Sequence, residues 1–259
     1  PGPAVGPAIP LSQVAIPSAL DLPPAAGVRL LTPRDGPSRG SQVSLSHPDG
    51  YAVVQAMIER RVIRVVVPYG GYQFYYDEGR PRGAIYELVQ RFETYLNEQL
   101  GRRNIKVYVV VIPVSREELL PALAQGHADF VAADLTITAE RSAEFSFSRP
   151  TLTGINEVVV TGPEAPLLNT LGDLAGQEIA VRASSSYFEH LQRLSDEFRE
   201  RGLEPPVIRP VDELLESEDL LEMLDAGMFG MTVLDDYKAK FWADVFPNIT
   251  VRNDLVVNE

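Results

Sequence analysis

The chain has 259 residues, a formal net charge of −13 at pH 7 and no cysteine. An acidic surface repels phosphate groups, so this charge argues against nucleic acid and against a bare anionic membrane surface as partners. The absence of cysteine excludes disulfides, thiol catalysis and cysteine-based zinc sites. The apolar fraction of 45% is enough for a packed core. The sequence holds no run of about 18 apolar residues, which a transmembrane helix would need.

Residues 1–50 are rich in proline and glycine and show neither a helical nor a strand period. Such a composition does not bury enough apolar surface to offset the entropy of ordering the chain. We therefore expect a tail or linker over 1–50, in which the apolar stretches at 14–22 and 28–31 can dock on a surface. The start at Pro1, without a methionine or a basic segment, indicates a mature or trimmed product.

From residue 51 onward, predicted strands and helices alternate. Runs of apolar residues predict strands at 62–67, 105–112, 129–133, 157–161, 178–182, 206–211 and 231–234, and a final extended segment at 249–257. Apolar residues at helical spacing predict helices at 51–61, 83–100, 115–125, 218–226 and 235–243, and one that follows residue 186 and ends near residue 201. Ser115 and Glu118 form a capping box for the third of these helices. The alternation predicts an α/β fold of parallel sheets with crossover helices.

The first candidate binding segment follows the strand at 129–133. Asp134, Thr136 and Arg141 gather where this strand ends, and Thr138 is placed to cap the next short helix. Open α/β sheets bind ligands at this edge. Arg141 offers a planar fork of donors that suits a carboxylate, which Thr136 and the N–H groups of the turn can share. A surface turn with Arg141 in a solvated ion pair is an equally good interpretation.

The second candidate is a run of three serines, Ser184, Ser185 and Ser186, between a predicted strand and a predicted helix. A helix N-terminus exposes unpaired N–H groups and about half a positive charge, so it attracts an anion. N-capping alone is the simpler explanation, because serine is favoured at that position. Capping needs only one serine and three are present, which favours a ligand role.

The third and fourth candidates are a carboxylate and an aromatic loop. Asp235 follows the strand at 231–234 and can hold a ligand ammonium group, unless it or Asp236 only caps the next helix. Tyr72 and Phe74 lie beside two glycines after the first strand, where they can form the wall of a pocket. The alternative is packing in the core or on the surface, to which we assign Tyr75 and Tyr76.

His47, His127 and His190 are isolated and lack the spacing of metal ligands. We therefore expect the histidines to be structural or exposed. The sequence contains no nucleophile elbow, phosphate loop or dinucleotide fingerprint. We expect neither a metal nor a cofactor.

Four segments of the chain resemble the family 3 solute-binding proteins, the two-lobed receptors of amino-acid transport systems. These segments are residues 63–67, 129–141, 145–150 and 181–187. Within that family, residues 171–176, 181–187, 218–227 and 235–240 look similar to the ligand-sensing part of the membrane-bound lytic murein transglycosylases F. The resemblance covers about residues 55–259 and implies an α/β, two-lobed periplasmic-binding-protein fold of type II.

The resemblance also implies a role for each candidate side chain. Arg141 matches the arginine that grips the ligand carboxylate, and Thr136 matches a hydroxyl neighbour in the same lobe. Ser185 and Ser186 match the residues at a helix start in the second lobe that meet this carboxylate. Asp235 matches the acidic residue that takes the ligand's amino group.

Two aspects of the first loop bear on the kind of ligand. Phe74 matches an aromatic residue of the family. Pro68 stands where many amino-acid receptors carry an acidic residue, so the resemblance does not favour a ligand with a basic side chain. It points instead to wall-derived peptides.

We expect lobe 1 at 51–157 plus 250–259 and lobe 2 at 158–249, with the ligand in a cleft. In the family, the chain returns to lobe 1 through one more strand and terminal helices, whereas this sequence stops at Glu259, just after that return begins. We therefore expect a fragment or a truncated relative that lacks the last elements of the fold. A catalytic domain or another protein chain would then complete lobe 1.

Together these observations predict a module, exported to the periplasm or associated with the outer membrane, that closes on a small amino-acid or muropeptide ligand. The module is not itself expected to be an enzyme. Three alternatives remain open. They are a free receptor that hands its ligand to an ABC transporter, an enzyme on the same scaffold with Asp134 or Glu140 as general acid, and a protein-interaction module with a vestigial cleft.

Overall fold

The structure, a computed structural model, describes residues 29–33, 48–101 and 105–259, and the side chains of residues 54–101 and 105–259. The chain forms two compact units. Unit 1 comprises Pro1–Pro68, Gln73–Val114 and Leu119–Thr151, and unit 2 comprises Tyr69–Tyr72, Ser115–Glu118 and Leu152–Glu259. The expectations for residues 14–22 and His47 lie outside the described residues.

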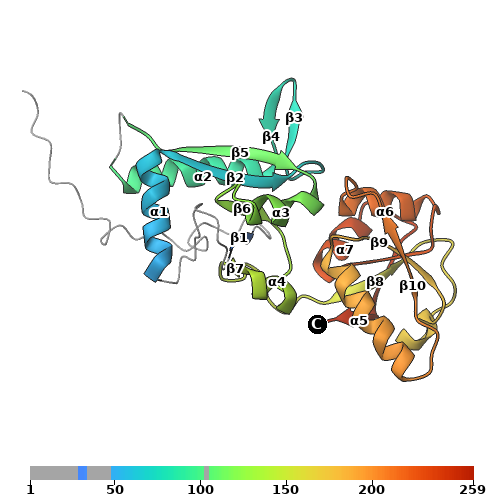
Figure 1. Cartoon of the computed structure of the whole chain (residues 1–259). Coiled ribbons are helices and arrows are strands. Elements are labelled where there is room, and N and C mark those ends of the chain that lie inside the picture. The colour runs from blue at the N-terminus through green and yellow to red at the C-terminus, as the bar shows by residue number, and fades with distance from the viewer. Residues whose placement is uncertain (1–28, 34–47, 102–104) are drawn as a thin grey trace, which may run out of the picture. The chain divides into compact units, whose positions relative to one another are not determined.

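Unit 1 is built on a five-stranded sheet with the order β5-β2-β6-β1-β7 (Figure 1). The strands are β1 (Arg29–Pro33), β2 (Val62–Pro68), β5 (Tyr108–Val114), β6 (Phe130–Ala133) and β7 (Phe145–Phe147). Strand β2 runs parallel to β5 and β6, whereas β1 runs antiparallel to β6 and β7. The remaining elements are α1 (Pro48–Arg60), the hairpin of β3 (Tyr75–Asp77) and β4 (Arg80–Arg82), α2 (Ala84–Gln99), α3 (Leu119–Ala124) and α4 (Ala139–Glu144).

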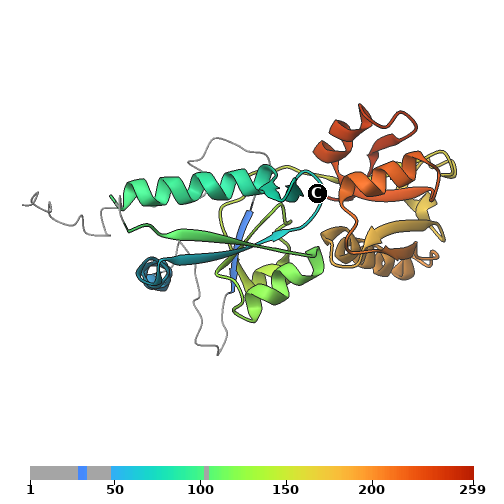
Figure 2. The same cartoon turned by 90° about the horizontal axis from the view of Figure 1, so that it is seen from above.

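Both faces of the unit 1 sheet are covered. Successive side chains of a strand point to opposite faces, so Val65 packs in one apolar cluster and Val66 in another. The first cluster includes residues of α1 and α2, and the second includes Leu119 and Leu123 of α3. Figure 2 shows α2 and α3 on opposite sides of the strands. All residues of β6 are buried, because this strand is covered on both faces and paired on both edges.

Unit 2 contains a three-stranded antiparallel sheet, β11-β8-β12, and a parallel pair, β10-β9. The strands are β8 (Glu157–Thr161), β9 (Glu178–Arg182), β10 (Val207–Val211), β11 (Met231–Asp235) and β12 (Thr250–Asn258). The helical elements are η2 (Arg116–Glu118), η3 (Leu171–Leu174), α5 (Ser186–Glu200), α6 (Ser217–Asp225) and α7 (Asp236–Ala243). A single cluster of buried side chains forms the core of this unit and includes Val159, Leu191, Phe198, Leu221 and Leu224.

The structure confirms every strand and helix expected from residue 51 onward, to within a few residues at each end. One arm of the expected capping box is present, since the backbone N–H of Ser115 donates to the carboxylate of Glu118; the hydroxyl of Ser115 donates to the same carboxylate. These hydrogen bonds favour the charged carboxylate and hold the pKa of Glu118 below its usual range. The sequence did not predict the short strands β3, β4 and β7, which have too few residues to show a period.

The expectation of a structureless tail over residues 1–50 is wrong for the described part of that region. Residues 29–33 form β1, and α1 begins at Pro48. The apolar stretch at 28–31 was expected only to dock on a surface. It joins the sheet because β6 and β7 both offer it backbone partners, a stabilisation that a sequence period does not reveal.

The expected domain boundaries also need correction. Residues 250–259 were assigned to lobe 1, but they belong to unit 2. Strand β12 pairs antiparallel with β8, with Val251 opposite Val160 and Arg252 opposite Val159. Backbone pairing with β8 therefore decides the position of this segment. Residues 69–72 and 115–118, expected in lobe 1, likewise belong to unit 2.

The unit 2 core predicts a sharp contrast between two leucines. Leu221 is 0% exposed and Leu214 is 64% exposed. Leu221→Ala should lower the free energy of unfolding by about 2–5 kcal/mol, because it removes buried methyl groups and leaves a cavity. The same change at Leu214 should alter it by no more than about 0.5 kcal/mol. Chemical denaturation of both variants checks this expectation, and equal effects would contradict the assigned core.

Candidate functional site

The polar turn of unit 1 is held by the end of β6 and the start of α4. Thr138 is the N-cap of α4, and its hydroxyl accepts from the backbone N–H of Arg141 at 3.2 Å. Arg141 is only 6% exposed, and its Nη1 donates to the carbonyl oxygen of Thr136 at 3.4 Å. The expected cap at Thr138 is thus confirmed. The alternative of a solvated Arg141 is wrong, because the residue is buried.

Asp134 is oriented by a glutamine that the sequence analysis did not single out. Nε2 of Gln73 donates to Oδ1 of Asp134 at 3.1 Å, and Gln73 is only 4% exposed. The backbone carbonyl of Gln73 accepts in turn from the N–H of Ile85 at the start of α2. Gly83 permits this approach, since a Cβ there would lie 2.2 Å from the same carbonyl oxygen. Helix α2 therefore fixes Gln73, and Gln73 orients Asp134.

Each serine at the start of α5 has its own partner within unit 2. The hydroxyl of Ser185 accepts from the N–H of Phe188 and donates to the carbonyl of Arg182, at 3.2 and 2.7 Å. Ser184 donates its N–H and its hydroxyl to the carboxylate of Glu213. Ser186 donates to Glu157 at 2.9 Å. The capping interpretation is therefore confirmed for Ser185, and the three hydroxyls do not converge on one point.

A buried cluster of charged side chains lies at one end of the β8–β11 pair. Glu157 and Asp235 occupy opposite positions on the two strands and are 2% and 6% exposed. Nδ1 of His190 lies 2.5 Å from Oε2 of Glu157, and Nζ of Lys238 lies 3.1 Å from Oδ2 of Asp235. Each carboxylate thus has its own nitrogen partner, as buried charges require. The sequence analysis missed Glu157, although a glutamate that heads a run of apolar strand residues is a recognisable signal.

Tyr187 closes this cluster from helix α5. Its phenolic oxygen accepts from the backbone N–H of Asp235 at 3.3 Å. Burial raises the pKa of Tyr187 far above its usual value, and the nearby charge of Asp235 raises it further. The phenol therefore stays neutral next to the two carboxylates.

The two described histidines are of the structural or exposed kind that we expected. His190 is buried against Glu157, and His127 is exposed. Within the described ranges, no group of three or more histidine, aspartate or glutamate side chains is placed to hold a metal ion.

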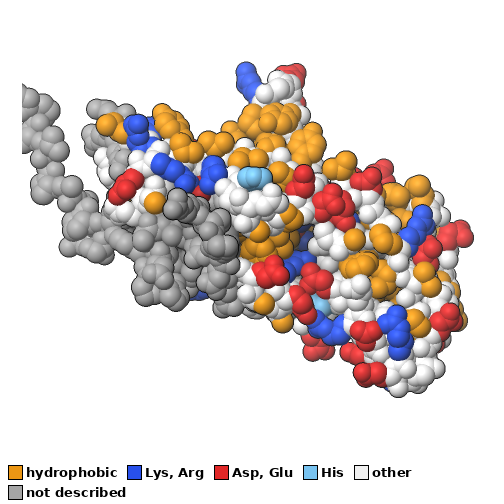
Figure 3. All heavy atoms as spheres, in the orientation of Figure 1, with side chains coloured by type: hydrophobic (Ala, Val, Ile, Leu, Met, Phe, Trp, Pro, Cys, Tyr) orange, Lys and Arg blue, Asp and Glu red, His pale blue; other side chains and the backbone are white. Residues whose placement is uncertain are grey.

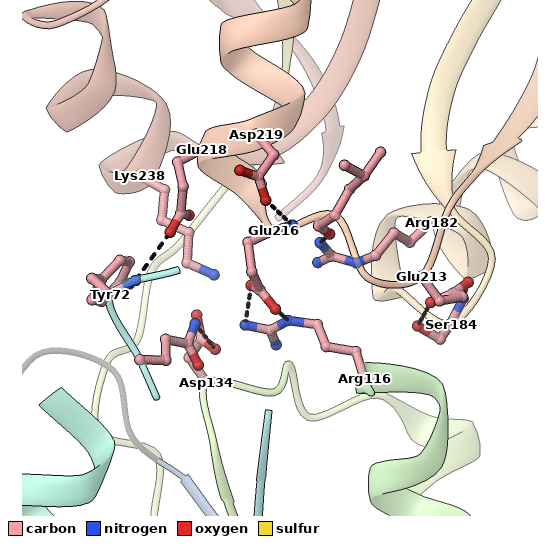
Figure 4. A network of polar contacts seen from close by, with 12 residues as sticks. Tyr72, Arg116, Asp134, Arg182, Ser184, Glu213, Glu216, Glu218, Asp219 and Lys238 are labelled. Atoms are coloured by element: carbon pink, nitrogen blue, oxygen red, sulfur yellow. Dashed lines mark hydrogen bonds and ion pairs between the residues drawn. The ribbon is translucent and has the colours of Figure 1, made fainter. Parts of the chain in front are cut away.

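A second polar network surrounds the start of α6 (Figure 4). The guanidinium of Arg116 makes a two-pronged ion pair with Glu216, with Nε 2.8 Å from Oε1 and Nη2 2.8 Å from Oε2. These side chains are only 8% and 2% exposed. Glu216 is also the N-cap of α6, in a capping box with Asp219. The pair therefore ties residues 115–118 to α6, and the sequence analysis missed it because the partners are 100 residues apart.

The aromatic loop divides into a packed part and an exposed part. Phe74 is 1% exposed and makes edge-to-face contacts with Tyr76 and Tyr86, with centroids 5.4 and 6.0 Å apart. Tyr72 is 49% exposed, and its backbone N–H donates to Oε1 of Glu218 at 3.3 Å. Phe74 is thus a core residue, whereas the ring of Tyr72 is accessible.

Figure 3 shows many acidic side chains on the displayed face of unit 2, in line with the net charge of −13.

The buried cluster predicts that Glu157 is required for stability. Glu157→Ala leaves His190 and Ser186 without their buried partner, so the free energy of unfolding should fall by about 3–5 kcal/mol. The matched control is Glu178→Ala, because Glu178 pairs with Arg209 on the surface, where both side chains are about half exposed. That change should cost no more than about 1 kcal/mol. Similar costs in urea denaturation would contradict the proposed difference.

Two glutamates should respond to pH with opposite sign. Burial raises the pKa of Glu218, with the charges of Glu216 and Asp219 adding to it. The folded state therefore holds this proton more tightly than the unfolded state, and the contribution of Glu218 to stability falls as pH rises above its usual value of 4.5. Glu218→Gln should be more stable than the parent chain at pH 7, and this gain should vanish near pH 4.

Glu118 is the control for this pH dependence. Its pKa is lowered, so its contribution to stability is present above the unfolded value and is lost as pH falls. Glu118→Gln should therefore be less stable than the parent chain at pH 7 and should approach it in acid. Melting curves between pH 4 and 7 compare the two variants, and a difference of the same sign would refute the assignment.

Several relatives match most of this chain. A membrane-bound lytic murein transglycosylase F of Idiomarina loihiensis is 28% identical over 213 residues, which are 81% of this chain and 43% of the relative. The same kind of protein in Ectopseudomonas mendocina is 30% identical over 196 residues, which are 74% of this chain and 37% of the relative. The chain therefore spans less than half the length of these relatives.

Solved structures share the fold at low sequence identity. An ancestral arginine-binding protein bound to arginine has a TM-score of 0.56 at 21% identity, over 74% of this chain and 78% of that protein. The holo arginine-binding protein of T. maritima has a TM-score of 0.54 at 19% identity, over 76% and 79%. These similarities confirm the expected α/β periplasmic-binding-protein fold of type II.

Two family profiles match the sequence. The kynureninase C-terminal domain matches residues 8–66, less than a quarter of the chain and mostly outside the described residues. The profile of the bacterial extracellular solute-binding proteins of family 3 matches residues 63–240, well over half of the chain. The match spans both the Arg141 turn and the serines at the start of α5. The chain belongs to the bacterial extracellular solute-binding proteins of family 3.

Proposed function

We propose that this chain is a ligand-binding module that senses a small amino-acid-like or cell-wall-peptide-like molecule and forms the regulatory part of a lytic transglycosylase-like protein. The observation that carries the proposal is the buried guanidinium of Arg141, held at the end of β6 within a segment that matches the solute-binding family. The similarity to the lytic transglycosylases F supports the regulatory role. The chain itself is proposed to perform no catalysis.

The Arg141 turn is suited to bind a carboxylate of the ligand. Nη1 of Arg141 donates to the carbonyl of Thr136 at 3.4 Å, so the guanidinium lies beside the turn that carries both residues. An arginine–carboxylate pair is a charge-assisted hydrogen bond and is correspondingly strong. We therefore assign Arg141 and Thr136 to the carboxylate, with Asp134, oriented by Gln73, as a neighbouring acceptor for ligand N–H groups.

The proposed contacts of unit 2 follow from what its side chains still offer. Ser185 and Ser186 donate their hydroxyl protons inside the unit, so a ligand would meet their oxygen lone pairs and the N–H groups at the start of α5. The carboxylate of Asp235 is paired with Lys238, so a ligand ammonium would share it with that lysine. Tyr72 offers an accessible aromatic ring, and Phe74 anchors the same loop in the core.

A transport receptor is the second candidate function. Among the structures of similar fold is an amino-acid ABC transporter substrate-binding protein of Streptococcus pneumoniae bound to L-arginine, with a TM-score of 0.54 at 18% identity. That similarity shows the fold alone. Pro68 at the end of β2 argues against an arginine-like ligand here, so arginine is a test of this alternative.

We also propose that the protein is exported, to the periplasm or to the outer membrane, because its family is extracellular. No described helix has the length and apolar character needed to cross a membrane.

A thermal-shift screen tests the proposed function. The panel contains arginine, glutamine, neutral amino acids, short wall peptides and muropeptides. A true ligand at about 100 times its dissociation constant should add about 2.7 kcal/mol to the free energy of unfolding. We expect wall peptides or muropeptides to stabilise the chain and arginine not to do so.

Arg141→Lys is the diagnostic variant, because it keeps the positive charge but loses the planar fork of donors. It should weaken binding at least ten-fold, which is about 1.4 kcal/mol. Arg149→Lys, the same change at an exposed arginine of unit 1, should leave binding unchanged. Stabilisation by arginine alone would favour the transport receptor, and no shift with any compound would favour an interaction module.

A further inference from the structure

Strand β1 is the first described element of the chain, yet it lies inside the unit 1 sheet. It separates β6 from β7 and runs antiparallel to both. Leu31 is opposite Val131 on one side and Phe147 on the other. The two neighbours follow each other in the chain, joined only by residues 134–144, which contain α4. A segment that precedes the rest of the unit therefore fills the interval between two consecutive strands.

The slot between β6 and β7, which β1 fills, has the features of a site for an extended peptide. Adjacent strands lie about 4.8 Å apart, so β6 and β7 without β1 would be too far apart to pair and would present two rows of unpaired backbone groups. Apolar side chains border this slot on both faces of the sheet. They are Val131, Ala133 and Phe145 on the α3 face, and Phe130 and Ala132 on the other. Backbone pairing supplies affinity for such a segment, and alternating side-chain positions supply specificity.

The connectivity of β1 allows the slot to be filled by a separate molecule. Among the strands of this sheet, β1 alone precedes α1, and residues 34–47 are its link to the rest of the unit. No described element precedes it, so the other strands do not depend on the covalent path through β1. Pro33, which has no N–H to donate, stands at the last position of the paired segment, as expected for a strand end. The recognised segment is thus short and well defined.

We propose that the slot between β6 and β7 is a strand-binding site, with residues 29–33 as its resident ligand, and that it also accepts this segment in trans as a free peptide. The ligand class is an extended, antiparallel, apolar peptide. The site differs from the proposed small-molecule contacts, although it adjoins one of them. Residues 134–144, which carry Arg141, connect the two strands that grip the peptide. Occupancy of the slot should therefore strengthen ligand binding at Arg141, a consequence that rests on the proposed function.

The test uses the full chain with a specific protease site inserted between Gly40 and Ser41. After cleavage, a fluorescent peptide of residues 27–35 should bind saturably, measured by anisotropy, and should raise the melting temperature of the cleaved protein as its concentration increases. The uncleaved chain is the first control. Its tethered strand competes at an effective concentration in the millimolar range, so it should bind the peptide at least ten-fold more weakly.

The second control is the same peptide with Leu31→Pro, which removes a backbone donor in the middle of the pairing register. It should bind at least ten-fold more weakly than the parent peptide and should not raise the melting temperature. The proposal is overturned if the cleaved protein binds neither peptide or binds both equally well. Melting is recorded with the cleaved fragment of residues 1–40 still present. The measurement therefore does not depend on whether residues 41–259 stay folded when this fragment is removed. Failure here with an intact ligand shift would leave the proposed function standing.

Discussion

Strand β6 needs a hydrogen-bonded partner on each edge, and much of unit 1 depends on this requirement. The strand is buried along its whole length, so every backbone N–H and C=O group on it must be paired within the protein. Strand β2 satisfies one edge and β1 satisfies the other. Because β6 is fixed on both edges, the polar turn at 134–141, which starts where β6 ends, also has a fixed position. The proposed carboxylate contact at Arg141 is therefore only as well placed as the strand that leads to it.

Unit 2 meets a different constraint, the burial of ionised groups. Glu157 and Asp235 lie opposite each other on two buried strands, where two unpaired negative charges would be strongly unfavourable. Lys238 supplies a positive charge next to Asp235, and His190, Ser186 and Tyr187 add hydrogen bonds. Side chains that resemble ligand contacts of the family are thus part of the internal charge balance of this unit. A ligand that uses them must fit into this network, which restricts its chemistry to groups that can share an acceptor.

The buried pair of Arg116 and Glu216 also holds unit 2 together. It fixes residues 115–118 to the start of α6, while Tyr72 makes a backbone contact with Glu218 in the same region. Residues 115–118 directly follow β5 in the chain, and residues 69–72, which include Tyr72, directly follow β2. Both of these strands belong to unit 1. Compact units in this protein are therefore not continuous stretches of sequence. Their boundaries follow side-chain pairing as much as chain order.

The sequence by itself determined the local elements, the family and the polar segments. Periodicity placed the strands and helices from residue 51 onward, because the apolar face of each element must be buried. Caps such as Thr138 and Ser185 were also predictable, since capping depends on residues within one helical turn.

Only the tertiary structure decided which strands pair and which polar groups meet. The place of β12 beside β8, the insertion of β1 between β6 and β7, and the partners of Glu157 and Arg116 all join residues that are distant in the chain. Their energies come from backbone pairing and charge compensation in three dimensions, which no local pattern of residues encodes.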